Sequence, residues 1–327
     1  TTYTHTFANI TANQTITATF TVNTYSITAT AGLNGTITPA GVTTVDYNNA
    51  QVYTIAPAVG YHIVDVVVDG LSMGPISTYT FANVMENHTI AATFAINTYT
   101  LTASINGNGT ITPAGVTTVN YGANQTYTIA PAAGSVIVDV IVDGTPMGVV
   151  TSYTFTNVDA DHTIQVITSS ATFNVTVTQP TNGAITPVTQ VVTYGATPTF
   201  TITPNMGYMI SAIIVNGTPA TFTANSAGVA TYTFAPIAAN ATITATMTMK
   251  TFTVTATAGA NGTITPSGVA TINYNANSAV YTFAPAAGYE VADVTVNGVS
   301  VGVVPSYQFV NVMANKTIGV TFQLIPC

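Results

Sequence analysis

Two pairs of aspartates are the residues of this sequence best suited to chemistry. Asp65 and Asp69 stand four residues apart in the run HIVDVVVDG, and Asp139 and Asp143 stand in the same relation in a second copy of that run. On a β-strand this spacing places both carboxylates on one face, and calcium prefers oxygen ligands. Asp69 and Asp143 also begin Asp-Gly turns, however, and the other two suit solvated strand positions. We therefore treat all four as weak calcium candidates.

The third copy of this run loses both acids, with Ser211 and Asn216 in their places. The histidines are equally scattered. His5, His88 and His162 fall near the ends of different copies, so they are not expected to converge on a metal or a catalytic base. The glycines at 107 and 109 lie between two expected strands, so they predict a hairpin turn rather than a phosphate loop. We expect no catalytic residue, no cofactor and no enzymatic activity.

Asparagine supplies the other candidate sites, because many asparagines begin an Asn-x-Ser/Thr sequon. Such sequons accept N-linked glycans in proteins outside the cell. Their number only slightly exceeds the chance expectation in a chain so rich in Thr and Asn. The candidates for glycosylation are Asn9, Asn13, Asn34, Asn87, Asn108, Asn124, Asn174, Asn216, Asn240, Asn261 and Asn315.

The low charge of the chain excludes several partners. Only 4% of residues are charged, Lys250 and Lys316 are the only basic residues, and the formal net charge is −8. Without a basic patch, neither nucleic acid nor an anionic membrane surface is an expected partner. No apolar run is long enough to span a bilayer. A trypsin-like protease would find two cleavage sites in the whole sequence, which favours an extracellular or cell-surface location.

The single cysteine, Cys327, is the last residue of the sequence. No intrachain disulfide is therefore expected. Two interpretations stay open: a free thiol or truncation point, and an intermolecular link or lipid attachment site.

Three markers recur in a fixed order and predict four tandem repeats. The first is Asn-Gly-x-Ile-Thr-Pro, the second is Asp/Asn-Gly after a valine-rich run, and the third is Tyr-x-Phe. Thr, Val, Ile, Tyr and Phe suit strands, and helix formers are scarce, so we expect an all-β fold. The markers fall at Gly35, Gly109, Gly183 and Gly262; at Gly70, Gly144, Gly217 and Gly298; and at Phe81, Phe155, Phe234 and Phe309.

Each repeat is expected to contain about six short strands. TYSITATA alternates apolar and polar residues as a half-buried strand does, and the Asn34-Gly35 dipeptide after it favours a type I′ hairpin turn. In HIVDVVVDG, alternation predicts that Val64, Val66 and Val68 point inward. Phe81 matches an inward position of the closing hairpin.

The expected boundaries follow from these markers. Residues 1–23 read as the closing hairpin of an incomplete repeat, and the complete repeats are 24–96, 97–173, 174–250 and 251–327. Almost no linker separates them, which favours a stiff rod of about 120–150 Å. The junction at Phe173 is expected to differ, because residues 165–171 look like an insertion. An isolated hairpin at residues 1–23 is marginal in water, so we expect either a fragment of a longer array or strand addition to a neighbouring molecule.

These features resemble the divergent internalin-type B-repeat, known as the Listeria–Bacteroides type of bacterial repeat. The aromatic first strand, NGxITP, the Val-rich strand and the Pro-x-x-Gly-Tyr turns at Pro57–Tyr61, Pro204–Tyr208 and Pro285–Tyr289 carry the resemblance across the whole chain. It implies a tandem array of small β-grasp-like domains in secreted or surface-anchored microbial proteins, without shared catalytic residues. Ser135 replaces the tyrosine of one turn, and the third repeat has a longer loop from Thr218 to Val229.

Two functions from different classes fit these observations. One is an extracellular structural protein, a surface stalk or filament subunit that serves as a rigid spacer or polymer building block. Exposed β-edges with few charges would then favour self-association. The other is an adhesin-type binding module that recognises a protein or a glycan. The longer loop of the third repeat is the feature of the sequence that favours binding.

Overall fold

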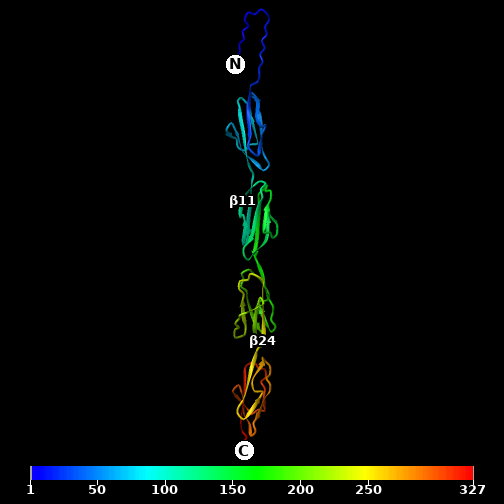
Figure 1. The fold of residues 1–327 in the computed structure, drawn as a ribbon, viewed down its shortest axis with the longest axis vertical. Helices are drawn as coiled ribbons and strands as arrows, with labels where there is room; N and C mark the ends of the chain where they lie inside the picture. The colour runs from blue at the N-terminus through cyan, green and yellow to red at the C-terminus, as the bar shows by residue number, and fades with distance from the viewer. Residues whose placement is uncertain (1, 327) are drawn as a thin grey trace. The chain divides into compact units, whose positions relative to one another are not determined.

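The computed structural model describes residues 2–326 and consists of strands, without a helix in that range. The strands build four repeated sheet units in tandem, so the predicted all-β repeat fold is confirmed. We call them the first to fourth repeats, β1–β8, β9–β16, β17–β24 and β25–β32 (Figure 1). Residues 2–326 contain no helix that could cross a lipid bilayer. Cys327 lies outside the described residues, so both interpretations of its thiol stay predictions.

The chain divides into two compact units that do not coincide with single repeats. Within the described residues, the first comprises residues 2–132 and 137–169, and the second comprises residues 133–136 and 170–326.

Every repeat pairs a five-stranded sheet with a three-stranded sheet. In the first repeat the orders are β3-β1-β8-β5-β6 and β2-β4-β7. The first and last long strands, β1 and β8, run parallel side by side, and their outer neighbours are antiparallel to them. The strands are β1 (Thr24–Ala31), β2 (Gly35–Thr38), β3 (Gly41–Asp46), β4 (Gln51–Pro57), β5 (Tyr61–Val68), β6 (Leu71–Ser72), β7 (Thr78–Phe81) and β8 (His88–Ile96).

The other repeats have the same strand orders and similar bounds. The second contains β9 (Thr98–Asn106), β10 (Gly109–Thr112), β11 (Gly115–Asn120), β12 (Gln125–Pro131), β13 (Ser135–Val142), β14 (Thr145–Pro146), β15 (Ser152–Phe155) and β16 (His162–Ser170). The third contains β17 (Thr172–Val177), β18 (Gly183–Thr186), β19 (Gln190–Thr193), β20 (Thr199–Pro204), β21 (Tyr208–Val215), β22 (Thr218–Ala220), β23 (Ala230–Thr233) and β24 (Ala241–Met249). The fourth contains β25 (Thr251–Ala258), β26 (Gly262–Thr265), β27 (Gly268–Asn273), β28 (Tyr281–Pro285), β29 (Tyr289–Val296), β30 (Val299–Gly302), β31 (Ser306–Tyr307) and β32 (Lys316–Leu324).

Each repeat has its own hydrophobic core between its two sheets. In the first repeat Ile27, Tyr53 and Val66 are fully buried, and Phe81 packs edge-to-face on Tyr53 with ring centroids 5.9 Å apart. The core uses alternate residues of each strand, because successive side chains point to opposite faces. The inward placement predicted for Phe81 is therefore confirmed.

A β-bulge changes which valines of β5 point inward. The pairing of β5 with β8 shifts register between Ile63 and Asp65. As a result Ile63 packs on the core, and Val64 is 48% exposed. The predicted inward position of Val64 is therefore wrong, whereas Val66 and Val68 are buried as predicted. A bulge inserts one residue into a strand and so reverses the faces on one side of it, which simple alternation does not reveal.

The glycine of NGxITP has a different role from the one predicted. Asn34 has a positive φ of 66°, but Gly35 does not and instead begins β2. A Cβ at Gly35 would lie 2.3 Å from Cζ of Phe94. The expected type I′ turn centred on Asn34-Gly35 is therefore wrong. Glycine is required here because an aromatic ring lies directly against the backbone.

The expected insertion before Phe173 is also wrong. β16 ends at Ser170 and β17 begins at Thr172, so Phe173 belongs to the first strand of the third repeat. The residue that corresponds to Phe94 is Thr168, whose hydroxyl donates to the carbonyl of Asn108 at 3.1 Å. β8 and β16 have the same length, so residues 165–171 correspond to residues 91–97 without an insertion.

Residues 2–23 precede the first strand and form no strand of their own. Most of their side chains are exposed, including Tyr3 and Phe20 at 91%. The predicted closing hairpin is not formed in residues 2–23.

Candidate functional site

Asp69 and His88 form a hydrogen-bonded pair at the turn that follows β5. Nδ1 of His88 lies 2.7 Å from Oδ2 of Asp69, and the backbone N–H of Thr89 donates to Oδ1 of Asp69 at 2.7 Å. The imidazole also lies 4.7 Å from the ring of Phe81, centroid to centroid. The second repeat has the same arrangement, with His162 2.8 Å from Asp143. Because these pairs connect residues 19 positions apart in the sequence, spacing alone did not reveal them.

Burial alone would raise the pKa of Asp69, but the hydrogen bonds from Thr89 and His88 outweigh it and lower that pKa below its ordinary value. The same causes lower the pKa of Asp143. Each carboxylate fastens the turn to the start of the last strand of its repeat. In the third and fourth repeats Asn216 and Asn297 accept from the backbone N–H of Thr242 and Thr317 instead. The repeated interaction is therefore structural, and the charge is specific to the first two repeats.

The other two calcium candidates have a separate role in a hydrogen-bonded turn. Oδ1 of Asp65 accepts from the hydroxyl of Ser72 at 2.7 Å and from the N–H of Gly74 at 3.0 Å. Oδ1 of Asp139 accepts from the N–H of Val140 and Gly148 at 2.8 Å. Within residues 2–326, no three His, Cys, Asp or Glu side chains are grouped to hold a metal ion.

Strand pairing identifies which residues truly correspond to Asp65. Asp65 pairs with Thr93, Ala212 pairs with Thr246, and Asp293 pairs with Thr321. The third repeat therefore has Ala212 at this position rather than Ser211. Sequence reasoning also missed Asp293, which accepts from the hydroxyl of Ser300 at 2.6 Å. The signal was present in the sequence as an aspartate four residues before Asn297.

Several sequon asparagines hold strands together through their side-chain oxygens. Oδ1 of Asn87 accepts from the N–H of Ser26 at 2.8 Å, and Oδ1 of Asn240 accepts from the N–H of Asn174 at 2.9 Å. Asn315 does the same with Thr253. In these three residues the oxygen is used by the fold. This structural role explains why an asparagine recurs at this position of the repeats. Glycosylation of the sequons stays a prediction.

The two remaining histidines contact different partners. Nδ1 of His62 lies 2.9 Å from Oδ1 of Asn97, and His5 packs edge-to-face on Phe7. No histidine of the described residues is hydrogen-bonded to a serine or cysteine that could act as a nucleophile.

A single residue links the first and second repeats, and both of its backbone groups are hydrogen-bonded. The N–H of Asn97 donates to the carbonyl of Gly60 at 2.8 Å, and the N–H of Tyr121 donates to the carbonyl of Asn97 at 2.9 Å. A Cβ at Gly60 would lie 2.1 Å from Cδ1 of Tyr121. The tyrosine ring of the second repeat therefore packs directly on a glycine of the first.

The second compact unit contains the same contacts around Lys250. The N–H of Lys250 donates to the carbonyl of Gly207 at 2.8 Å, and the N–H of Tyr274 donates to the carbonyl of Lys250 at 2.9 Å. A Cβ at Gly207 would lie 2.5 Å from the ring of Tyr274. The linker residue differs between the two sites, and the contacts persist because backbone groups make them.

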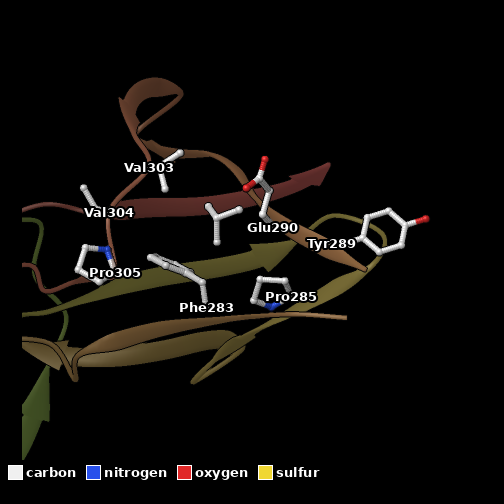
Figure 2. Close-up of a pocket in the computed structure, with 8 residues that line it drawn as sticks. Phe283, Pro285, Tyr289, Glu290, Val303, Val304 and Pro305 are labelled. Carbon is white, nitrogen blue, oxygen red and sulfur yellow. The ribbon is translucent and has the colours of Figure 1, made fainter. Parts of the chain in front are cut away.

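A groove of about 430 Å³ lies between the two sheets of the fourth repeat. Figure 2 shows Phe283 and Pro285 along one side, Val304 and Pro305 at one end, and the Tyr289 hydroxyl pointing outward at the other. Its walls are mostly apolar. The carboxylate of Glu290 already accepts from Nε2 of Gln323 at 2.9 Å.

A larger groove of about 540 Å³ lies beside the long loop of the third repeat. Met209 and Ile210 of β21, Phe222 of the loop, and Phe252 of β25 contribute its apolar walls. Lys250 lines the same groove and is one of the two basic residues of the chain.

Polar groups of the long loop and the following strand complete the larger groove. Asn225, Ser226 and Thr251 line it and are exposed. This combination of apolar walls, hydroxyl groups and one ammonium is typical of a small-molecule site.

No family model and no curated protein sequence matches this chain. Among solved structures, the chain is similar to the Bacillus anthracis TIE protein, at 10% identity over 93% of this chain and 75% of that one, with a TM-score of 0.33. It is also similar to the pilus adhesin SpaC from Lactobacillus rhamnosus GG, at 10% identity over 78% and 47%, with a TM-score of 0.16. A bacterial ice-binding adhesin matches at 9% identity over 70% and 97%, with a TM-score of 0.13.

Proposed function

We propose that this protein is an extracellular structural repeat protein, a surface stalk or filament subunit whose tandem repeats act as a rigid spacer. The observation that carries this proposal is the recurring linker contact. Asn97 and Lys250 are each the single residue between two strands, and each is hydrogen-bonded on both sides. A linker fixed in this way has little freedom to act as a hinge.

The packing of tyrosine on glycine supports the same role. A ring that rests on bare backbone at Gly60 or Gly207 buries apolar surface across the linker. Neither contact requires a charged side chain, which fits a chain with 4% charged residues. A structural protein outside the cell needs folded, protease-resistant repeats rather than a reactive site.

Small-angle X-ray scattering of the purified protein tests the spacer role. We expect a scattering profile characteristic of a stiff extended particle, unchanged across ionic strength. A profile characteristic of flexibly joined globules would contradict the proposal. The variant Tyr121→Ala is expected to shift the profile toward flexibility, and Tyr47→Ala is the matched control, because Tyr47 is 49% exposed.

Self-association is the second part of this proposal. The outer strands β3 and β6 of the first repeat's larger sheet, and β2 and β7 of its smaller sheet, each have one unpaired edge. Uncharged edges favour pairing with another chain. Sedimentation velocity over a wide concentration range should reveal assembly, which Val42→Lys on the exposed side of β3 should weaken. A monomer at all concentrations would contradict the filament role but not the stalk role.

A second candidate function is adhesin-type binding of a protein or glycan. The groove beside residues 218–229 favours it, because that loop does not recur in the other repeats. Binding to cultured cells, compared between the intact protein and a variant with residues 218–229 replaced by residues 71–77, tests this candidate. Equal binding by both would contradict a role for the loop.

A further inference from the structure

The long loop of the third repeat is built as a preformed turn. The N–H of Asn225 donates to the carbonyl of Val229 at 2.8 Å, and the N–H of Gly228 donates to the carbonyl of Asn225 at 2.8 Å. Oδ1 of Asn225 accepts from the N–H groups of Ala227 and Val229, both at 3.0 Å. The loop therefore holds one wall of the groove in place before any ligand arrives, which reduces the entropy cost of binding.

The position of Lys250 is fixed in the same way. Its backbone N–H and carbonyl are both hydrogen-bonded, so the side chain starts from a defined point at the groove. Within residues 2–326, the two contacts close enough for a salt bridge join a histidine to an aspartate, so in that range Lys250 has no carboxylate partner. The ammonium of Lys250 is therefore the one positive group that lines the groove, and it can pair with an anion there.

The rest of the groove indicates what that anion is attached to. Phe222 and Phe252 offer apolar ring surface, and Ser226 and Thr251 offer hydroxyl groups. The side-chain N–H₂ of Asn225 is also free to donate, because only its oxygen is used by the turn. A sugar ring matches this set, since it has an apolar C–H face and a rim of hydroxyl groups. A peptide chain would instead require backbone partners for its N–H groups.

We propose that this groove binds a carboxylate-bearing sugar, such as a uronic acid residue of an acidic glycan, with its carboxylate on Lys250 and its C–H face on Phe222 and Phe252. This inference specifies a ligand class for the second candidate function and is independent of the spacer role. A volume of about 540 Å³ suits one or two sugar rings.

Isothermal titration calorimetry of the intact protein with methyl glucuronide tests this site. Methyl glucoside, which has a hydroxymethyl group in place of the carboxylate, is the matched ligand and should bind at least about fivefold more weakly. Lys250→Gln should raise the Kd for the glucuronide about five- to tenfold. Lys316→Gln removes the same charge in β32 and should leave the Kd unchanged. Saturation-transfer NMR should show the ring C–H protons in contact, and Phe222→Leu should reduce that signal.

Three outcomes would overturn the proposal: no saturable binding of the glucuronide, equal binding of the glucoside, or equal weakening by Lys250→Gln and Lys316→Gln. Binding of an acetylated peptide with a free C-terminal carboxylate, in preference to the glucuronide, would assign the groove to peptides instead. Cell adhesion by the unaltered protein, together with its failure to bind the glucuronide, would refute this site and leave the adhesive function standing.

Discussion

Two regions of the molecule differ in the groups that hold them in place. One is the pair of linkers at Asn97 and Lys250, and the other is the loop at residues 218–229. The linkers keep the same hydrogen bonds although an amide side chain replaces an ammonium, because backbone groups and a glycine make the contacts. The loop occurs once, and the side chain of Asn225 accepts two hydrogen bonds that add to the backbone hydrogen bonds of its turn. The comparison teaches that hydrogen bonds of backbone groups tolerate a change of residue at the linker, whereas the turn of the unique loop also uses one particular side chain.

We expect the largest difference in the free energy of unfolding between a substitution in the repeated core and one in the unique loop. Tyr53 is fully buried in the first repeat, so Tyr53→Ala should lower the free energy of unfolding by about 3–5 kcal/mol. Phe222 in the loop is only partly buried, and Phe222→Ala should cost less than about 2 kcal/mol. Urea unfolding followed by tyrosine fluorescence measures both. Equal losses would contradict the view that the loop is an addition to a self-sufficient core.

The contribution of the linker contact to stability can be measured by comparing alanine substitutions at two glycines. Gly60 and Gly288 have nearly the same positive φ, 80° and 84°, but only Gly60 has a tyrosine ring against it. Gly60→Ala and Gly288→Ala should therefore share the cost of backbone strain. The Gly60 variant should lose about 1–3 kcal/mol more, because a Cβ would overlap Tyr121. Thermal unfolding of both variants measures this difference, and indistinguishable melting would contradict the packing described for the linker.

The buried tyrosines of the first two repeats should respond differently to loss of the hydroxyl group. The hydroxyl of Tyr53 is buried and has no hydrogen-bond partner among the described residues. The hydroxyl of Tyr127 lies 3.5 Å from the carbonyl of Leu101. Tyr53→Phe should therefore stabilise the protein by about 1 kcal/mol, and Tyr127→Phe should change stability little. Destabilisation by Tyr53→Phe, measured by chemical unfolding, would show that this hydroxyl is satisfied in solution.

The smallest expected effect is on the pH dependence of stability. It should come from the first two repeats, which have an aspartate where the last two have an asparagine. Asp69 has a folded-state pKa below its ordinary value, so its contribution is present above pH of about 4 and is lost as pH falls through the lowered pKa. The carboxylate is 43% exposed, so the effect should be less than about 1 kcal/mol. Asp69→Asn should flatten this part of the stability profile between pH 2 and 5. Asn297→Ala should leave the profile's shape unchanged, because Asn297 does not titrate.

The fold class and the number of repeats could be predicted because period and composition are local properties. Alternation correctly placed Val66, Val68 and Phe81 in the core. It failed at Val64, because a bulge reverses the faces of a strand without leaving a mark in the alternating pattern. The turn predicted from the Asn34-Gly35 dipeptide was also wrong, because this glycine makes room for the ring of Phe94.

The candidate sites were harder to predict, because they depend on contacts between distant strands. Pairing β5 with β8 joins Asp69 to His88, and nothing in either segment alone shows it. The groove at Lys250 needs a loop of one repeat and the first strand of the next. Spacing could identify the acids and the long loop as unusual, but only the three-dimensional arrangement shows what lies beside them.

The central claim is that the contacts at the linker hold neighbouring repeats in a fixed relation. Double electron–electron resonance, which measures the distance between two spin labels, tests it most directly within the first compact unit. Labels at Thr36 and Thr110 occupy equivalent exposed positions in the first and second repeats, in a Cys327→Ser background. We predict one narrow distance distribution, which Tyr121→Ala broadens. A broad distribution in the protein with an intact linker would contradict the claim.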